Sequence, residues 1–138
     1  MSIQESNVER MQFFVAQVQE RGRLELIDGL VHPDFRNHTV EQGQRDDRAG
    51  IGETVAAMHE AFSGLQIEML HCVGDGEFVA THKMFRGRHT GSWFGLPASG
   101  NAVEFRVMDL VRFRGGQWVE HWAVADAVNL LRQIGALG

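Results

Sequence analysis

The chain has 138 residues, 43% of them hydrophobic and 22% charged, which is the balance of one ordinary globular domain covering residues 1–138. With 18 Asp and Glu against 13 Lys and Arg, the net charge of −5 argues against a dedicated nucleic-acid binder. The single cysteine, Cys72, excludes a disulfide framework, and neither a signal peptide nor a membrane-spanning apolar run of about 18 residues is visible. We therefore expect a protein of the cytoplasm.

The first half of the chain has the residue spacing of helices. Ser2 and Glu5 have the spacing of a capping box at the start of a first helix. The apolar face of this helix is formed by Val8, Met11, Val15 and Val18. Residues 24–30 predict a short second helix, and a brief strand is expected over 35–40. Asp47 is placed to cap a third helix, whose apolar stripe is formed by Ile51, Val55, Met58 and Phe62.

The second half of the chain changes to the period of strands. The predicted strands cover residues 65–73, 77–86, 102–113 and 117–124. Asp126 is expected to cap a last helix with Val128, Leu131 and Ile134 directed inward. Helices followed by a run of strands indicate an α+β fold with an antiparallel sheet. A curved sheet around the N-terminal helices would form a cone with an internal pocket.

Several segments carry a resemblance to a known family when taken in their order. The segments GRHTGSWFGLPASGNAVEF, GGQWVEHWAVAD and LLRQIGALG, preceded by HPDFRNH, resemble the SnoaL-like polyketide cyclases of the nuclear transport factor 2-like superfamily. The resemblance covers nearly the whole chain and implies an α+β cone. It also implies an intramolecular aldol ring closure of a polyketide ester, without a metal or cofactor.

The chain departs from this family at the position of the catalytic carboxylate. The resemblance places that general acid/base two residues after the His of the EHW-type motif, where this chain has Ala123. A histidine that is common on the preceding strand corresponds here to Asp109, and the asparagine near the first strand corresponds to Asn37. His89, within GRHTG, matches a recurring position of the family.

Asp109 is the strongest catalytic candidate from the residues themselves. Alternation places it on one strand face, together with Phe105, Val107, Val111 and Phe113. Burial on such a face raises the pKa of a carboxylate and suits it to act as a base near neutral pH. Two alternatives stay open: a buried Asp109 paired with a neighbouring His or Arg, and a reversed strand that exposes Asp109.

His121 is the second catalytic candidate. Strand alternation places it on one face with Val119 and Ala123, opposite to Trp118 and Trp122. If His121 shares the inner face with Asp109, the two residues form an acid/base dyad. The alternative is a histidine that only satisfies a core hydrogen bond.

The remaining histidines of the second half have weaker assignments. His82 and His89 lie on opposite faces unless a bulge at Gly87 intervenes, so one of them is expected to face the cavity. We favour His89 as the catalytic one, although it is also placed to brace the long loop that follows. The spacing of His82, His89 and His121 supports no zinc motif, and we expect no metal.

Other residues are expected to bind the substrate. Asn37 and His38 are placed to orient a carbonyl or an enolate oxygen, with local turn hydrogen bonds as the alternative for Asn37. A cavity for a flat, apolar or aromatic small molecule is expected to be lined by His82, Met84, Phe62, Trp93 and Phe94. Trp93 and Phe94 occupy a glycine-flanked loop that suggests a lid, and core packing is the alternative for the helical aromatics.

An outward face of Trp118 and Trp122 would leave an exposed apolar stripe on the sheet, so we expect a homodimer through this face. Within the superfamily, a steroid-isomerase function is disfavoured because the chain has no Tyr, and an epoxide-hydrolase function is disfavoured because Val107 stands where an Arg is needed. Three interpretations remain: a cofactor-free cyclase-type enzyme, a hydroxylase-like relative, and a non-catalytic protein that binds a small molecule in the same cone.

Overall fold

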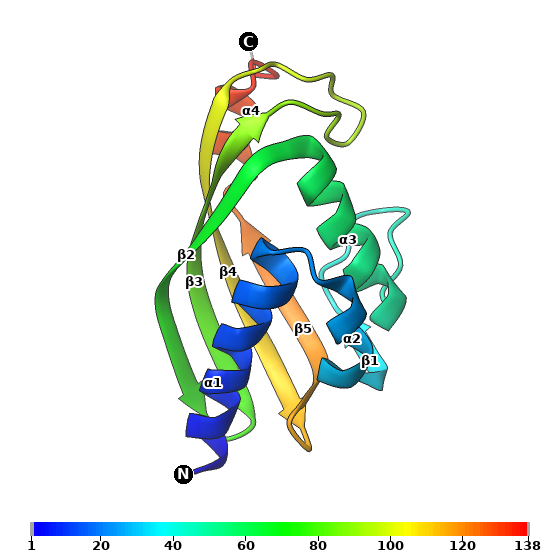
Figure 1. The fold of residues 1–138 in the computed structure, drawn as a ribbon, viewed down its shortest axis with the longest axis vertical. Helices are drawn as coiled ribbons and strands as arrows, with labels where there is room; N and C mark the ends of the chain where they lie inside the picture. The colour runs from blue at the N-terminus through cyan, green and yellow to red at the C-terminus, as the bar shows by residue number, and fades with distance from the viewer. Residues whose placement is uncertain (1, 138) are drawn as a thin grey trace.

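The computed structural model describes residues 2–137 and shows one strongly curved sheet with helices on its concave side (Figure 1). The five strands have the order β1-β5-β4-β3-β2 across the sheet. They are β1 (Val31–Asn37), β2 (Phe62–Asp75), β3 (Phe78–His89), β4 (Ala102–Arg114) and β5 (Gln117–Ala125). Neighbours from β2 to β5 are antiparallel, whereas the edge strand β1 pairs with β5 in parallel. The expected α+β cone is confirmed.

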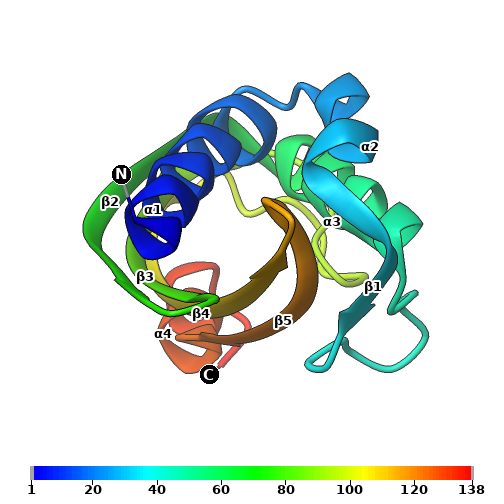
Figure 2. The ribbon, with the colours of Figure 1, turned by 90° about the horizontal axis from the view of Figure 1, so that it is seen from below.

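The helices occupy two positions relative to the sheet. α1 (Ile3–Phe14) continues into the π-helical segment η1 (Val15–Glu20), and together they lie inside the curl of the sheet (Figure 2). The 3-10 turn η2 (Leu24–Leu26), α2 (Ile27–Leu30) and α3 (Arg48–Ala61) form the opposite wall beside β1. α4 (Ala127–Gln133) packs against β4 near the C-terminus.

The predicted helix caps are present. Ser2 and Glu5 form the reciprocal capping box of α1, and the carboxylates of Asp47 and Asp126 accept backbone N–H groups at the starts of α3 and α4. Ile134 is buried and Leu131 packs against the core, as expected, but Val128 is exposed and Leu130 is buried in its place. A helix this short is positioned by its packing on β4, and the cap alone does not determine its rotation.

The first strand also differs from the expectation. β1 begins at Val31 and ends at Asn37, so it starts and finishes earlier than the predicted strand and contains Pro33. Proline cannot donate a ladder hydrogen bond, but it is tolerated on an edge strand, which is where β1 lies. β2 also starts earlier than predicted, because α3 ends at Ala61 and Phe62 continues directly into the strand.

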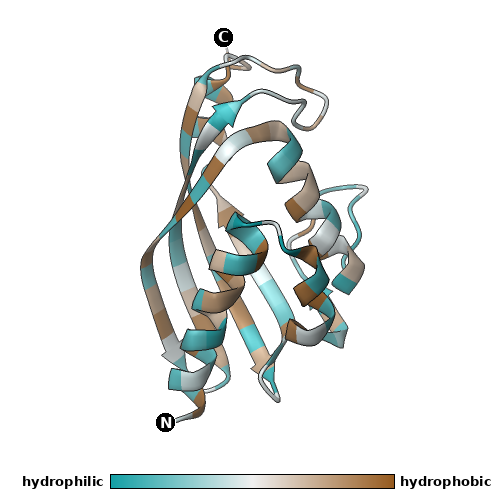
Figure 3. Cartoon of the chain, viewed as in Figure 1, coloured by the Kyte–Doolittle hydropathy of each residue, from teal (hydrophilic) through white to brown (hydrophobic). Residues whose placement is uncertain are grey.

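Burial alternates along β4, and polar and apolar residues follow one another along the central strands, as the teal and brown bands of Figure 3 show. The lower core lies between α1, η1 and the sheet, and it includes Met11, Phe14, Val18, Phe35, Val111 and Trp118. The upper core lies between β2, β3, β4 and α4, and it includes Phe62, Leu65, Phe85, Phe105 and Ile134. Partly buried Val107 packs against this upper core, on the same face as Asp109.

A β-bulge in β5 reverses one of the sequence expectations. Phe113 pairs with Trp118 and Arg112 pairs with Glu120, so Val119 is the extra residue. The bulge turns Trp118 inward, where it stacks on Phe14 with ring centroids 4.0 Å apart and is 2% exposed. The prediction that Trp118 belongs to an outer dimer surface is therefore wrong.

Candidate functional site

Asp109 and His121 meet on the inner face of the sheet. Asp109 pairs with Ala123 across β4 and β5, and His121 is two residues away on the same strand as Ala123. The Nε2 of His121 donates a hydrogen bond of 2.9 Å to Oδ1 of Asp109. Asp109 is 6% exposed, which rules out the alternative of a reversed strand, and the expected Asp–His contact is present.

A buried lysine, Lys83 on β3, completes this group and was not found from the sequence. Its side chain is 1% exposed, and its Nζ forms an ion pair with Oδ2 of Asp109. The same Nζ donates to Oε1 of Gln19 at 2.8 Å, and the hydroxyl of Thr81 approaches Oδ2 of Asp109 at 3.5 Å. The sequence could have indicated Lys83, because it is two residues from Thr81 and from Phe85 and therefore shares their inward face of β3. β3 is the strand that pairs with the one carrying Asp109.

Lys83 changes the electrostatic expectation for Asp109. Burial raises the pKa of this carboxyl, but the positive charge of Lys83 and the hydrogen bond from His121 outweigh burial, so the pKa lies below its usual range. Asp109 is therefore ionised at neutral pH. The expectation that its pKa is raised, as needed for a base near neutral pH, is wrong.

His121 is the member of the group that reaches solvent. Its side chain is 14% exposed, and its Nδ1 has no hydrogen-bond partner among residues 2–137. A carboxylate only accepts hydrogen bonds, so Nε2 carries the hydrogen and Nδ1 carries the lone pair. The ring stacks on Trp118 with centroids 5.5 Å apart, which fixes its plane. Val107 and Ala123, on the same face, are also partly exposed, so the inner face is open at this point.

The π-helical segment η1 supplies the helical side of the site. Gln19 binds Lys83 through its side chain, and its carbonyl accepts a hydrogen bond of 2.8 Å from Nε2 of His59 on α3. Glu20 accepts a hydrogen bond of 2.7 Å from the backbone of Ile67 on β2. Departures from α-helical winding are frequent at functional sites, and this one ties η1 to both β3 and α3.

Asn37 lies beside His121, but its side-chain oxygen accepts hydrogen bonds from a neighbouring residue of the turn. The two residues are Cα partners between β1 and β5. Oδ1 of Asn37 accepts hydrogen bonds from the backbone and the hydroxyl of Thr39, which is the turn chemistry kept as the alternative. The hydroxyl of Thr39 in turn accepts from the backbone of Ala123 at 2.9 Å. The backbone N–H of Asn37 donates to the carbonyl of Asp46 at 2.8 Å, whereas the side-chain Nδ2 of Asn37 has no partner within residues 2–137.

Three of the expected substrate-binding residues lie on the outer face instead. His38 donates a hydrogen bond of 2.9 Å to Glu120 and stacks on Trp122. His82 and Met84 alternate with Thr81 and Lys83 along β3 and so point away from Asp109. His82 also forms a hydrogen bond of 3.1 Å between its Nδ1 and that of His71. These side chains cannot line the same interior as Asp109.

His89 lies far from Asp109 on the same face of the sheet. It follows Thr81 by eight residues on β3, which separates it from the site by about 26 Å along the strand. It is fully buried, and its Nδ1 accepts a hydrogen bond of 3.1 Å from the backbone of Ser99. His89 thus braces the long loop after β3, and the structure does not bring it together with His121.

The aromatic pair of this loop divides between two environments. Trp93 packs on Phe62 with ring centroids 5.3 Å apart, within the upper core that Val107 joins. Phe94 is 60% exposed and has a left-handed backbone, with φ at 47°. Phe62 and Trp93 therefore lie along the inner face beyond Val107, whereas Phe94 projects from the loop.

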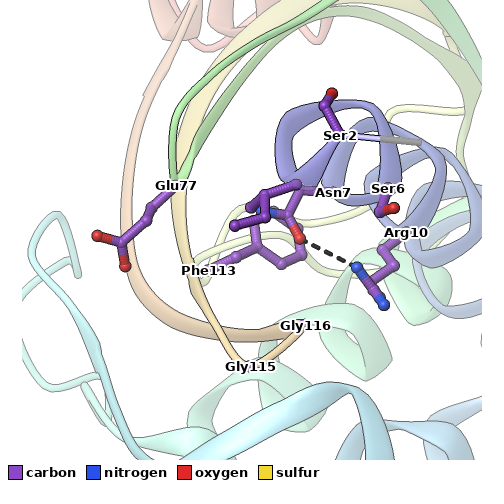
Figure 4. Close-up of a pocket in the computed structure, with 9 residues that line it drawn as sticks. Ser2, Ser6, Asn7, Arg10, Glu77, Phe113, Gly115 and Gly116 are labelled. Carbon is purple, nitrogen blue, oxygen red and sulfur yellow. Dashed lines mark hydrogen bonds between the residues drawn. The ribbon is translucent and has the colours of Figure 1, made fainter.

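Two hollows of about 420 and 430 Å³ lie beside the N-terminal half of α1, and neither is lined by Asp109 or His121. The first is lined by the start of α1 and the turn between β4 and β5, with Asn7 accepting a hydrogen bond of 3.2 Å from Arg10 (Figure 4). Within residues 2–137, His82, His89 and His121 do not converge, and no group of three potential ligands is placed to hold a metal. In the same residues no helix has the length and apolar character to span a membrane.

The comparisons with known proteins agree with this architecture. The sequence profile described as SnoaL-like polyketide cyclase matches residues 9–134, so the chain belongs to that family. No curated protein sequence matches it. The fold is similar to that of TsrD from Streptomyces laurentii, with a TM-score of 0.87 and 25% identity over 96% of this chain and 97% of that one.

Two further solved structures share the fold. IdmH from Streptomyces antibioticus, described as a candidate polyketide cyclase, has a TM-score of 0.79 and 26% identity, and the match covers 94% of this chain and 98% of that one. AclR from Streptomyces galilaeus, described as a candidate hydroxylase, has a TM-score of 0.79 and 24% identity over the same shares of the two chains.

Proposed function

We propose that this protein catalyses cyclase-type proton transfer on an apolar or aromatic, polyketide-like small molecule, with His121 as the proton carrier. The observation that carries the proposal is the hydrogen bond of 2.9 Å from His121 to the ionised Asp109, on an inner face that is partly open. A carboxylate that holds one imidazole nitrogen fixes the tautomer and stabilises the imidazolium that forms when the other nitrogen takes a proton. Membership of the SnoaL-like family supports the substrate class.

The chemistry needs only groups that the inner face presents. Nδ1 of His121 removes a proton from a carbon flanked by two carbonyl groups, and the electron pair of that C–H bond becomes an enolate. The enolate carbon attacks a carbonyl of the same molecule, a C–C bond forms, and the imidazolium returns its proton to the resulting alkoxide. The free amide nitrogen of Asn37, beside His121, is placed to donate a hydrogen bond to the enolate oxygen. The partly exposed Trp93 would hold the flat part of the substrate, supported from behind by the buried Phe62, and this scheme requires no cofactor.

The test is exchange of an acidic carbon-bound proton. Aryl 1,3-dicarbonyl esters are incubated with the protein in D₂O, and deuterium incorporation is followed by NMR. His121→Asn and Asp109→Asn should each lower the exchange rate by about 10²–10⁴-fold, the usual contribution of a positioned base. His71→Asn, on the outer face, is the matched control and should leave the rate unchanged. Equal rates in the parent protein and in His121→Asn would refute the assignment.

A non-catalytic binding function is the second candidate, favoured by Ala123 at the position of the family's carboxylate. Saturable binding of these esters without exchange would select it, and a hydroxylase-like function would show as oxygen incorporation in place of cyclisation. Ala123→Asp, next to Asp109 in the strand register, restores the missing carboxylate and tests whether the inner face still positions an ester for ring closure.

Two further expectations remain part of the proposal. One is a location in the cytoplasm. The other is a homodimer through the outer sheet face, now without Trp118. The exposed apolar side chains that support the dimer are Phe78, Met108, Leu110 and Val124, beside the partly buried Trp122.

A further inference from the structure

Among residues 2–137, Lys83 is the one buried cation at the site, and the reaction scheme above does not use it. Its ammonium group is held by two acceptors, the carboxylate of Asp109 and the side-chain oxygen of Gln19 at 2.8 Å. Its alkyl chain runs through the core, with Nζ 5.4 Å from the centre of the Phe85 ring. Lys83 is not placed to touch a bound molecule, because its side chain is 1% exposed and lies behind Asp109 as seen from His121.

The role of Lys83 follows from the sum of the charges on Lys83, Asp109 and His121. Asp109 uses one oxygen for Lys83 and the other for His121, so a single carboxylate faces two potential cations. With Lys83 charged, the pair of Lys83 and Asp109 is already neutral. A proton added to His121 then gives the group a net positive charge. Without Lys83, the same proton would neutralise a buried carboxylate, and the imidazolium would be held much more strongly.

The other titratable groups on the surrounding elements are engaged elsewhere. His59 on α3 binds the Gln19 carbonyl, Glu20 on η1 binds the Ile67 backbone, and Cys72 on β2 contacts the Val8 carbonyl. Asn37 on β1 and Thr81 on β3 are uncharged. Glu120 and His38 pair with each other on the outer face. Lys83 and Asp109 therefore dominate the field at His121.

We propose that Lys83 is a positioning residue that cancels the charge of Asp109 and so keeps His121 a neutral imidazole, with Nδ1 ready to accept a proton. The inference rests on the proposed function, in which His121 carries the proton. Asp109 then orients the ring through Nε2 without holding it as a permanent imidazolium. Gln19, presented by the π-helical segment, fixes the ammonium group on the far side of the carboxylate.

The test follows the charge state of His121 by ¹⁵N NMR of the imidazole, which requires no substrate. In the parent protein at pH 7.5, His121 should be neutral with its hydrogen on Nε2. In Lys83→Met, the titration midpoint of His121 should move upward by about one pH unit or more, the usual effect of an uncompensated neighbouring charge. Lys83→Arg keeps the charge and should restore the midpoint, whereas Lys83→Met combined with Asp109→Asn should remove the upward shift.

Each outcome decides the proposal. An imidazolium at His121 in the parent protein at pH 7.5 would overturn it, and this measurement does not depend on whether Lys83→Met folds. An unchanged midpoint in Lys83→Met, or the same upward shift in Lys83→Arg, would also overturn it. If the shifts occur as expected but the parent protein exchanges no ester proton, the role of Lys83 in the charge balance stands and the proposed enzyme function fails.

Discussion

The buried pair of Lys83 and Asp109 makes a strong prediction about stability. Both side chains are almost fully removed from water, so replacing either one leaves the other as an uncompensated buried charge. Removing one partner of such a pair costs about 3–5 kcal/mol. Replacing both partners leaves no unpaired charge and is often close to neutral. At a pH that keeps His121 neutral, Lys83→Met and Asp109→Asn should therefore each cost about 4 kcal/mol, and the double variant should cost much less than their sum.

Urea unfolding at pH 9, where His121 does not take up a proton that would compensate Asp109, measures this directly. With a denaturant slope of about 2 kcal/mol per molar urea, each single variant should lower the unfolding midpoint by about 2 M. The coupling energy from the double-mutant cycle should be about 3 kcal/mol or more, above the usual range of error for such cycles. Asp109→Asn keeps an oxygen for the hydrogen bond from His121, so the cycle isolates the ion pair from that contact.

A matched control pair is available on the same sheet. Arg86 and Glu104 form an ion pair of 2.8 Å at the surface, and pairs of this kind contribute about 0–1 kcal/mol. Additive effects of Lys83→Met and Asp109→Asn, or costs as small as those of the surface pair, would refute the reasoning. They would mean that water or a neighbouring group compensates the remaining charge.

Lys83 and His121 lower the pKa of Asp109 in the folded protein. The ionised Asp109 therefore makes its full contribution to the free energy of unfolding above the unfolded-state pKa of about 3.9, and this contribution is lost as pH falls through the lower folded-state pKa. The difference in urea midpoint between the parent protein and Asp109→Asn should therefore be constant from pH 7 to about pH 5 and shrink at more acidic pH. Trp118→Ala removes an indole packed on Phe14 and should cost about 3–5 kcal/mol in thermal or urea unfolding, whereas an outward Trp118 would make this change nearly silent. Trp122→Ala on the outer face should instead weaken the proposed dimer in light scattering, and an unchanged mass at micromolar concentration would count against that interface.

Local physical signals were sufficient for much of this protein. The capping residues Ser2, Asp47 and Asp126 begin the helices that the sequence predicts, because a cap acts within one turn of the chain. The alternation over residues 102–113 places Asp109 among inward apolar side chains, because the period of a strand is set by its own backbone. The family segments, read in order, identified the cone.

The tertiary structure decided the features that depend on register between distant strands. The bulge at Val119 sends Trp118 inward together with His121, and nothing in the local alternation of β5 indicates where an extra residue will be accommodated. The parallel pairing of β1 at the sheet edge explains how Pro33 is tolerated. The ionisation of Asp109 depends on Lys83, which lies 26 positions earlier in the chain and is brought to it by the register of β3 and β4. The sequence alone shows that the Asp109 carboxylate faces the core. Its ionisation depends on the side chains around it, which come together only when β3, β4 and β5 pair and η1 packs against them.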